Sequence, residues 1–130
     1  MKLLLDTHIW VRWLSSDQPL REDIQATIGE AELLAVSAVS CWEVAYLSKQ
    51  GRLRLPCDIE QWMNLALEGS QVRPVPVSSA VAVASALLPD KHKDPADRII
   101  IATALAMKYQ LVSFDKRFLE YDELKGNLIA

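Results

Sequence analysis

The stretch 94–109, DPADRIIIATALAMKY, decides the fold class of this chain. Asp94 followed by Pro95 is a strong helix start, because aspartate caps helices and proline fits the first helical position. The apolar residues then run almost all round the predicted helix, Pro95–Tyr109, which implies that it is buried on both sides.

Short apolar strands alternate with helices along the rest of the sequence. Strands are expected at Lys2–Leu5, Leu33–Val36, Val72–Val77 and Leu111–Ser113, with an edge strand at Leu128–Ile129. Further helices are expected after the first strand and at Leu20–Gly29, Ser40–Gln50, Ile59–Glu68 and Ser78–Leu88, with a short one ending near Leu119. This alternation predicts a single α/β domain over residues 1–130, with three layers (α/β/α) and a central, mostly parallel sheet.

Composition narrows the class of protein further. The chain has 130 residues, of which 51% are hydrophobic and 24% charged, with a net charge of −3. An acidic balance argues against a broad basic surface for nucleic acid, but it leaves room for phosphate contacts through a bound cation. Cys41 and Cys57 lack metal-ligand spacing and are expected to be reduced. With no signal-peptide pattern and no apolar run long enough to span a membrane, we expect a cytoplasmic protein.

Acidic side chains follow the predicted strands. Asp6 comes directly after the first strand, Glu43 lies early in the helix after the second, and Asp115 lies just beyond the last core strand. Asp94 and Asp97 flank the start of the long helix. In a parallel sheet these positions share the carboxyl edge, where ligands of such sheets bind.

Each acid also has a purely structural interpretation. Ser40-x-x-Glu43 has the form of a capping box, and Asp94, Asp6 and Asp115 could each cap a following helix. As a group, however, clustered carboxylates repel one another unless a cation compensates. Oxygen ligands favour a hard cation such as Mg²⁺ or Mn²⁺.

Histidines and basic residues lie close to these acids in the sequence. His8 and His92 either orient the acids or substrate, or have plain structural roles. Arg98 is expected to form a buried ion pair with Asp94 or Glu43. Lysines and arginine beside the acids suggest a cationic rim that suits a phosphodiester: Lys91, Lys93, Lys116 and Arg117.

Four stretches together resemble the motifs of PIN-domain proteins, in particular VapC-like toxins of bacterial toxin–antitoxin pairs. They are 4–8 (LLDTH), 37–43 (SAVSCWE), 92–104 (HKDPADRIIIATA) and 111–115 (LVSFD), where serine replaces a common threonine. The resemblance implies a Mg²⁺- or Mn²⁺-dependent endoribonuclease that cuts RNA, forms a homodimer and is neutralised by a cognate antitoxin. It implies metal binding by the acids Asp6, Glu43, Asp97 and Asp115. Asp94, Thr7, Ser113 and Arg98 are then auxiliary residues.

Other functions compete with this one. A receiver-type signalling module has a similar size and an acidic Mg²⁺ pocket, but it needs adjacent acids after the first strand, where Asp6 stands alone. A PIN-like protein that only binds partners is a further alternative, and a D-x-D phosphatase does not fit Asp6-Thr7-His8.

The aromatic residues allow two interpretations. The faces around Ile9, Trp10 and Trp13, around Trp42 and Tyr46, and at Trp62 either pack in the core or receive a partner helix. Core packing is the favoured expectation for most of them.

Overall fold

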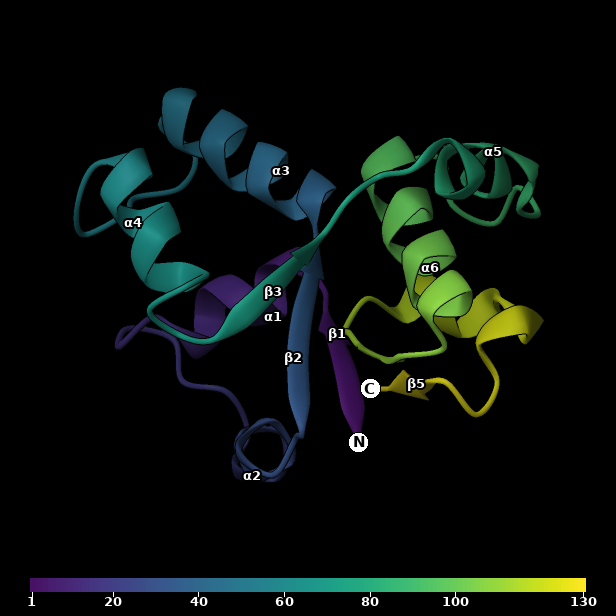
Figure 1. Cartoon of the computed structure of the whole chain (residues 1–130), viewed down its shortest axis with the longest axis horizontal. Coiled ribbons are helices and arrows are strands. Elements are labelled where there is room, and N and C mark those ends of the chain that lie inside the picture. The colour runs from purple at the N-terminus through teal and green to yellow at the C-terminus, as the bar shows by residue number, and fades with distance from the viewer.

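The computed structural model describes all 130 residues, and its centre is a five-stranded parallel sheet (Figure 1). The strands are β1 (Lys2–Leu5), β2 (Leu33–Ser37), β3 (Val72–Val75), β4 (Gln110–Val112) and β5 (Leu128–Ile129). Every neighbouring pair is parallel, which confirms the predicted sheet. The strand order β3-β2-β1-β4-β5 differs from the 2-1-3-4-5 order of receiver modules, and this contradicts that alternative.

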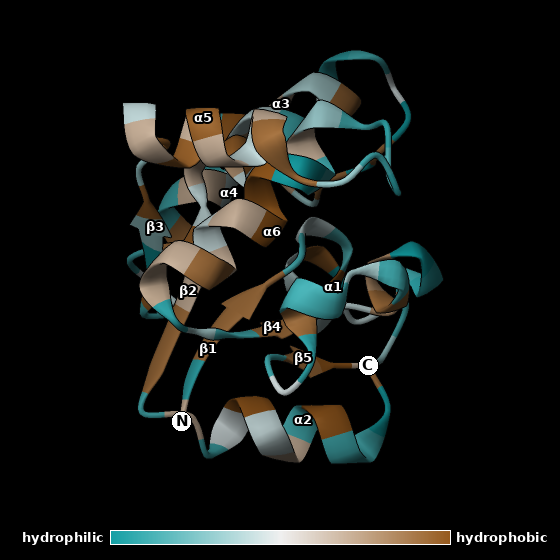
Figure 2. Cartoon of the chain, turned by 90° about the vertical axis from the view of Figure 1, so that its right-hand side faces the viewer, coloured by the Kyte–Doolittle hydropathy of each residue, from teal (hydrophilic) through white to brown (hydrophobic).

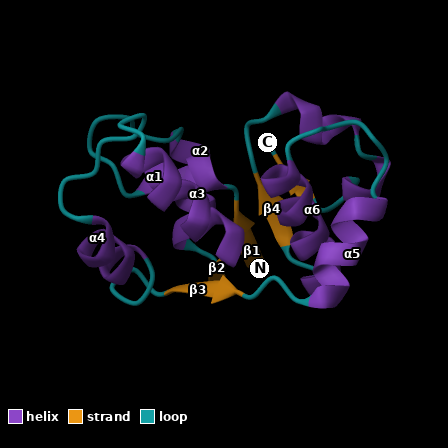
Figure 3. Cartoon of the chain, turned by 90° about the horizontal axis from the view of Figure 1, so that it is seen from above, coloured by secondary structure: helices purple, strands orange, loops and turns teal.

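Helices cover both faces of the sheet, as Figure 3 shows from above. One face carries α1 (Thr7–Trp13), α2 (Glu22–Gly29), α3 (Ala38–Lys49) and α4 (Ile59–Ala66). The other carries α5 (Ser79–Leu87), α6 (Pro95–Met107) and the 3₁₀ turns η1 (Lys116–Glu120) and η2 (Asp122–Leu124). The three-layer α/β/α prediction is therefore confirmed. None of these helices has the length and apolarity that crossing a membrane requires.

The central strands supply apolar side chains to both helical layers, and they are brown in the hydropathy colouring of Figure 2. In β1, Leu3 and Leu5 pack in the same core cluster as Trp10, whereas Leu4 packs in the opposite cluster with Ile100. Successive residues of a strand point to opposite faces, so a strand covered on both sides reads as a continuous apolar run.

Some element ends differ from the expected ranges for local reasons. Helix α6 ends at Met107 because Lys108 adopts a left-handed conformation with φ 58°, after which Tyr109 is buried. Strand β3 lies at the edge of the sheet, where Pro74 is tolerated, and it ends at Val75.

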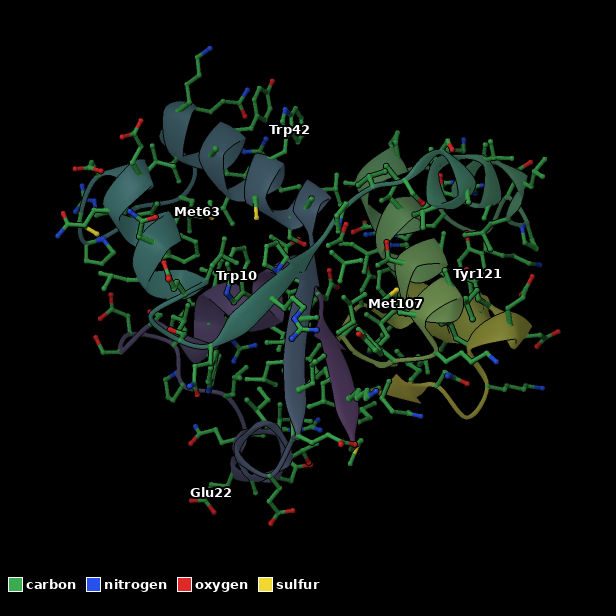
Figure 4. The ribbon with its side chains drawn as sticks, in the orientation of Figure 1. Trp10, Glu22, Trp42, Met63, Met107 and Tyr121 are labelled. Atoms are coloured by element: carbon green, nitrogen blue, oxygen red, sulfur yellow. The ribbon has the colours of Figure 1, made fainter.

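The aromatic residues divide into buried and exposed groups. Trp10 and Trp62 are buried with ring centroids 5.0 Å apart, and the Trp10 Nε1–H donates to the Ala66 carbonyl at 3.1 Å. Core packing was wrong for Trp42 and Tyr46, which are 59% and 42% exposed and stack with ring centroids 4.9 Å apart. Figure 4 shows Trp42 on the outer side of α3. They lie outside the face of α3 that is buried against the rest of the protein.

Arg98 does not form the expected ion pair with Asp94 or Glu43. Its guanidinium instead donates to five backbone carbonyl oxygens at 2.6–3.2 Å, those of Ser85, Ala86, Leu88, Pro89 and His92. The last carbonyls of a helix have no partner within the helix and carry partial negative charge, and here the C-terminal end of α5 presents them to the arginine fork. Arg98 thus fixes the loop that leads from α5 into α6.

Replacing Arg98 with lysine is expected to lower the free energy of unfolding by about 2–4 kcal/mol, because an ammonium group cannot reach five carbonyls at once. Urea denaturation of both proteins measures the difference. Arg52→Lys, at an exposed arginine that contacts Gln50, is the matched control and should leave stability unchanged. Equal stability of the Arg98→Lys variant and the parent would contradict this role.

Candidate active site

Five carboxylates converge at the carboxyl edge of the sheet. Asp6 follows β1 and Asp115 follows β4, Glu43 lies on α3, and Asp94 and Asp97 lie at the start of α6. All five line one pocket of about 350 Å³. The chain leaves β1 toward β2 on one side and returns to β4 on the other, so Asp6 lies at the switch point where ligands of open α/β sheets bind.

Asp6 is held by two hydrogen-bond donors and lies beside His8. It is 3% exposed, and its Oδ1 accepts the Thr7 backbone N–H at 2.8 Å. Its Oδ2 accepts the Ser113 hydroxyl at 2.6 Å and lies 3.2 Å from His8 Nδ1. Ser113 Oγ also accepts the Asp115 backbone N–H at 3.0 Å, so this hydroxyl connects two of the acids.

Glu43 is positioned by Thr7 and not by a capping box. The Thr7 hydroxyl donates to Glu43 Oε1 at 2.6 Å and lies 2.8 Å from Ser40 Oγ. The helix cap is Ser37, whose hydroxyl accepts the Val39 N–H. The capping-box interpretation of Ser40-x-x-Glu43 is therefore wrong, because α3 begins before Ser40.

Both histidines contact acids of the site. His92 is buried, its Nδ1 accepts the Asp94 backbone N–H at 3.2 Å, and the ring proton therefore resides on Nε2. The Nε2 nitrogen lies 2.8 Å from Asp97 Oδ2 and is hydrogen-bonded to Asp115 Oδ2 at 3.4 Å. His8 is arranged in the opposite sense: its Nε2 accepts the Phe114 N–H at 3.2 Å, and its Nδ1 faces Asp6. The orienting role that the sequence left open is thus present in the geometry of both rings.

Mutual repulsion of the acids is greatest at Asp97. Burial, followed by the charges of Asp6, Asp94, Glu43 and Asp115, raises the pKa of Asp97 from 3.8 to about 8. Burial also raises the pKa of Glu43, although the hydrogen bond from Thr7 acts in the opposite direction. In the absence of a cation, we therefore expect Asp97 to be the acid of the pocket that holds a proton to the highest pH.

Asp115 behaves in the opposite way. Burial acts to raise its pKa, but hydrogen bonds from Arg117 and His92 hold the value at about 2. Arg117 binds both carboxylate oxygens, with Nε 3.1 Å from Oδ1 and Nη2 3.0 Å from Oδ2. The other basic residues of the expected rim, Lys91, Lys93 and Lys116, are exposed.

The donor atoms suit a hard divalent cation. Ligand atoms of Glu43, Asp94 and Asp97 lie within 4.8 Å of one another, as do those of His92, Asp97 and Asp115. Asp97 belongs to both groups, and oxygen donors dominate, as Mg²⁺ and Mn²⁺ prefer. Asp94 also caps α6, its Oδ1 accepting the Ala96 N–H at 3.0 Å, so its helix-cap interpretation is confirmed alongside its place in the cluster.

Five residues of the pocket carried no signal as site residues in the sequence. They are Val11, Arg12, Gln18, Leu47 and Leu53. In retrospect, three of them lie four residues beyond a predicted site residue on the same helix, and therefore on the same face: Val11 after Thr7, Arg12 after His8 and Leu47 after Glu43.

Solved structures with this fold include toxin–antitoxin assemblies. The toxin–antitoxin complex from Klebsiella pneumoniae has a TM-score of 0.70 and 25% identity, covering 99% of this chain and 97% of that one. FitAcB from Neisseria gonorrhoeae has a TM-score of 0.66 and 22% identity, covering 98% and 96% of the two chains, and supports the fold alone.

Sequence comparison identifies a relative with higher sequence identity to this chain. Ribonuclease VapC22 of Mycobacterium tuberculosis (strain ATCC 25618 / H37Rv) is 36% identical over 116 residues, 88% of each protein. The model of the PIN domain matches residues 3–124, which include all five acids of the pocket. On these matches, the chain belongs to the PIN domain family.

Proposed function

We propose that this protein is a divalent-cation-dependent endoribonuclease of the VapC type, which hydrolyses RNA phosphodiester bonds and is neutralised by a cognate antitoxin. The observation that carries the proposal is the convergence of five carboxylates in one pocket, with the pKa of Asp97 near 8. A relative named as a ribonuclease and a toxin–antitoxin complex of the same fold support it.

The acids Asp6, Glu43, Asp97 and Asp115 would hold the cation, Mg²⁺ or Mn²⁺. When bound, such an ion neutralises phosphate charge and lowers the pKa of a coordinated water. Thr7 and Ser113 hold Glu43 and Asp6 through hydrogen bonds at 2.6 Å, and the rings of His8 and His92 lie 3.2 Å from Asp6 and 2.8 Å from Asp97.

No side-chain nucleophile is needed for this chemistry. The Thr7 hydroxyl is engaged by Glu43, and neither cysteine lines the pocket. We expect the products of this attack by water to carry a 5′-phosphate and a 3′-hydroxyl. We also propose that the protein is cytoplasmic and acts as a homodimer.

A PIN-like protein that only binds a partner is the remaining alternative. It shares the fold and the acids, but its pocket would not need to cleave RNA.

Asp6→Asn is expected to reduce RNA cleavage on the order of 100-fold or more, because asparagine keeps the shape but lacks the anionic ligand. Cleavage of a mixed, end-labelled RNA pool with Mg²⁺, Mn²⁺ or EDTA measures this loss. Asp94→Asn is the matched variant and should retain substantial activity, since asparagine also caps helices. Full cleavage by a folded Asp6→Asn protein would rule out its assignment as a ligand. Inactivity of a folded Asp94→Asn protein would mean that Asp94, and not Asp97, is the third metal-binding acid.

Without a cation, stability should decrease as the pH rises. Between pH 3.8 and about 8, folded Asp97 keeps a proton that the unfolded chain has released. The folded state then binds more protons than the unfolded state, so the free energy of unfolding falls across this window and levels off above it. Urea denaturation in EDTA at several pH values tests this. Asp97→Asn should flatten the profile, and a parent profile that rises from pH 6 to 8 would contradict the arrangement of charges.

Cation binding should displace the same proton. At pH 7, Mn²⁺ is expected to release about one proton per chain, and its affinity should increase up to about pH 8. Titration calorimetry in buffers with different ionisation enthalpies counts the protons. Binding with wild-type affinity and no proton release would show that the cation does not engage Asp97.

A further inference from the structure

Arg12 lies between the acidic pocket and a second hollow. On α1 it is one turn beyond His8, and it lines the pocket of the five acids. It also lines an adjoining pocket of about 330 Å³, together with Trp13, Pro19 and Leu20. A ligand that extends from the acids along this surface therefore passes Arg12.

The guanidinium of Arg12 is largely unused by the protein. Its Nη2 donates to the Pro19 carbonyl at 3.2 Å, and its Nε is buried with no hydrogen-bond partner. None of the ion pairs in the chain includes Arg12, although five carboxylates line the same pocket. By contrast, the guanidinium of Arg98 donates to five carbonyls, and that of Arg117 is paired with Asp115.

An aromatic ring restrains this guanidinium without using its donors. The Arg12 Cζ lies 5.6 Å from the centroid of Phe114, the residue before Asp115. Arg21 approaches the same ring at 4.9 Å, and its Nε and Nη2 bind Asp23 and the Ala130 carbonyl. Cation–π attraction thus holds two positive charges at this ring, of which Arg12 also lines the pocket of the acids.

A polyanionic strand entering an acidic pocket needs positive charge at more than one phosphate. A bound cation neutralises the phosphate at the acids, whereas the next phosphate meets only the charge fixed in the protein. The Nη1 and Nη2 edge of the Arg12 guanidinium keeps spare donors and suits two oxygens of a phosphate group, whereas the buried Nε is out of reach. We propose that Arg12 binds the phosphate next to the scissile one and so positions the RNA strand. This inference rests on the proposed function.

Equilibrium binding of a labelled single-stranded RNA pool tests the proposal. Fluorescence anisotropy is measured at several salt concentrations with Ca²⁺ in place of Mg²⁺, and a gel confirms that the RNA stays intact. Arg12→Gln is expected to weaken Kd roughly tenfold at low salt and to reduce the log–log salt slope by about 0.7, the value for one phosphate contact on a single strand. In cleavage assays its KM should rise while kcat changes little.

Two further variants show whether a loss of RNA affinity comes from the lost charge, from the lost geometry of the guanidinium or from misfolding. Arg21→Gln removes a guanidinium from the same ring, but Arg21 does not line the pocket of the acids and is paired with Asp23, so the Kd of this variant should stay within about twofold of wild type. Arg12→Lys keeps the charge but not the fork, and should restore the salt slope without restoring the full affinity. It also serves as the deciding variant if Arg12→Gln does not fold.

Unchanged Kd and salt slope in a folded Arg12→Gln protein would overturn the inference. The Arg12 guanidinium would then be free to bind a carboxylate of a protein partner and not an RNA phosphate. Retention of RNA without cleavage by Mg²⁺ or Mn²⁺ would overturn the nuclease proposal, while the Arg12 comparison could still be read from binding. If the wild-type chain does not retain RNA at all, both proposals fail.

Discussion

Repulsion among carboxylates at one edge of the sheet is the constraint on which the site depends. A parallel sheet brings the ends of β1, β2 and β4 together, and five acids follow them. Three of these acids cap the element that begins beside them: Asp6 caps α1, Asp94 caps α6 and Asp115 caps η1. The positive end of a helix partly offsets their charge. An acid can therefore both cap a helix and bind a cation. The backbone N–H groups at the start of each helix stabilise the negative charge of the acids before a cation binds.

His8 and His92 are oriented in the same way, each by a backbone N–H group. Each receives a backbone N–H on one ring nitrogen, which leaves the proton on the other nitrogen, and that proton faces a carboxylate. A histidine arranged in this way turns its donor nitrogen toward the acids. His92 and His8 thereby help to orient the carboxylates beside them.

The sequence predicted the elements and the acidic edge because both follow from local rules. Buried parallel strands are short apolar runs, and residues directly after them share an edge. The partners of polar side chains could not be predicted in this way. Arg98 binds carbonyls at the end of α5, whose position depends on how α5 and α6 pack. The proton position of His8 depends on the amide of Phe114, 106 residues away along the chain. Trp42 and Tyr46 are exposed because α3 buries another of its faces, which its apolar composition does not distinguish.

Net charge and local charge lead to different expectations for RNA binding. A chain of net charge −3 repels a polyanion at long range, so its affinity must come from a few fixed cations and the bound ion. The three arginines at or near the pocket have different roles. Arg98 fixes the loop before α6, and Arg117 compensates Asp115. Arg12 is the guanidinium in the pocket wall that the fold leaves with spare donors. Such an acidic protein binds RNA with appreciable affinity only where one phosphate lies at the acids and the next lies at Arg12. This requirement favours one alignment of the strand in the site over non-specific electrostatic attraction.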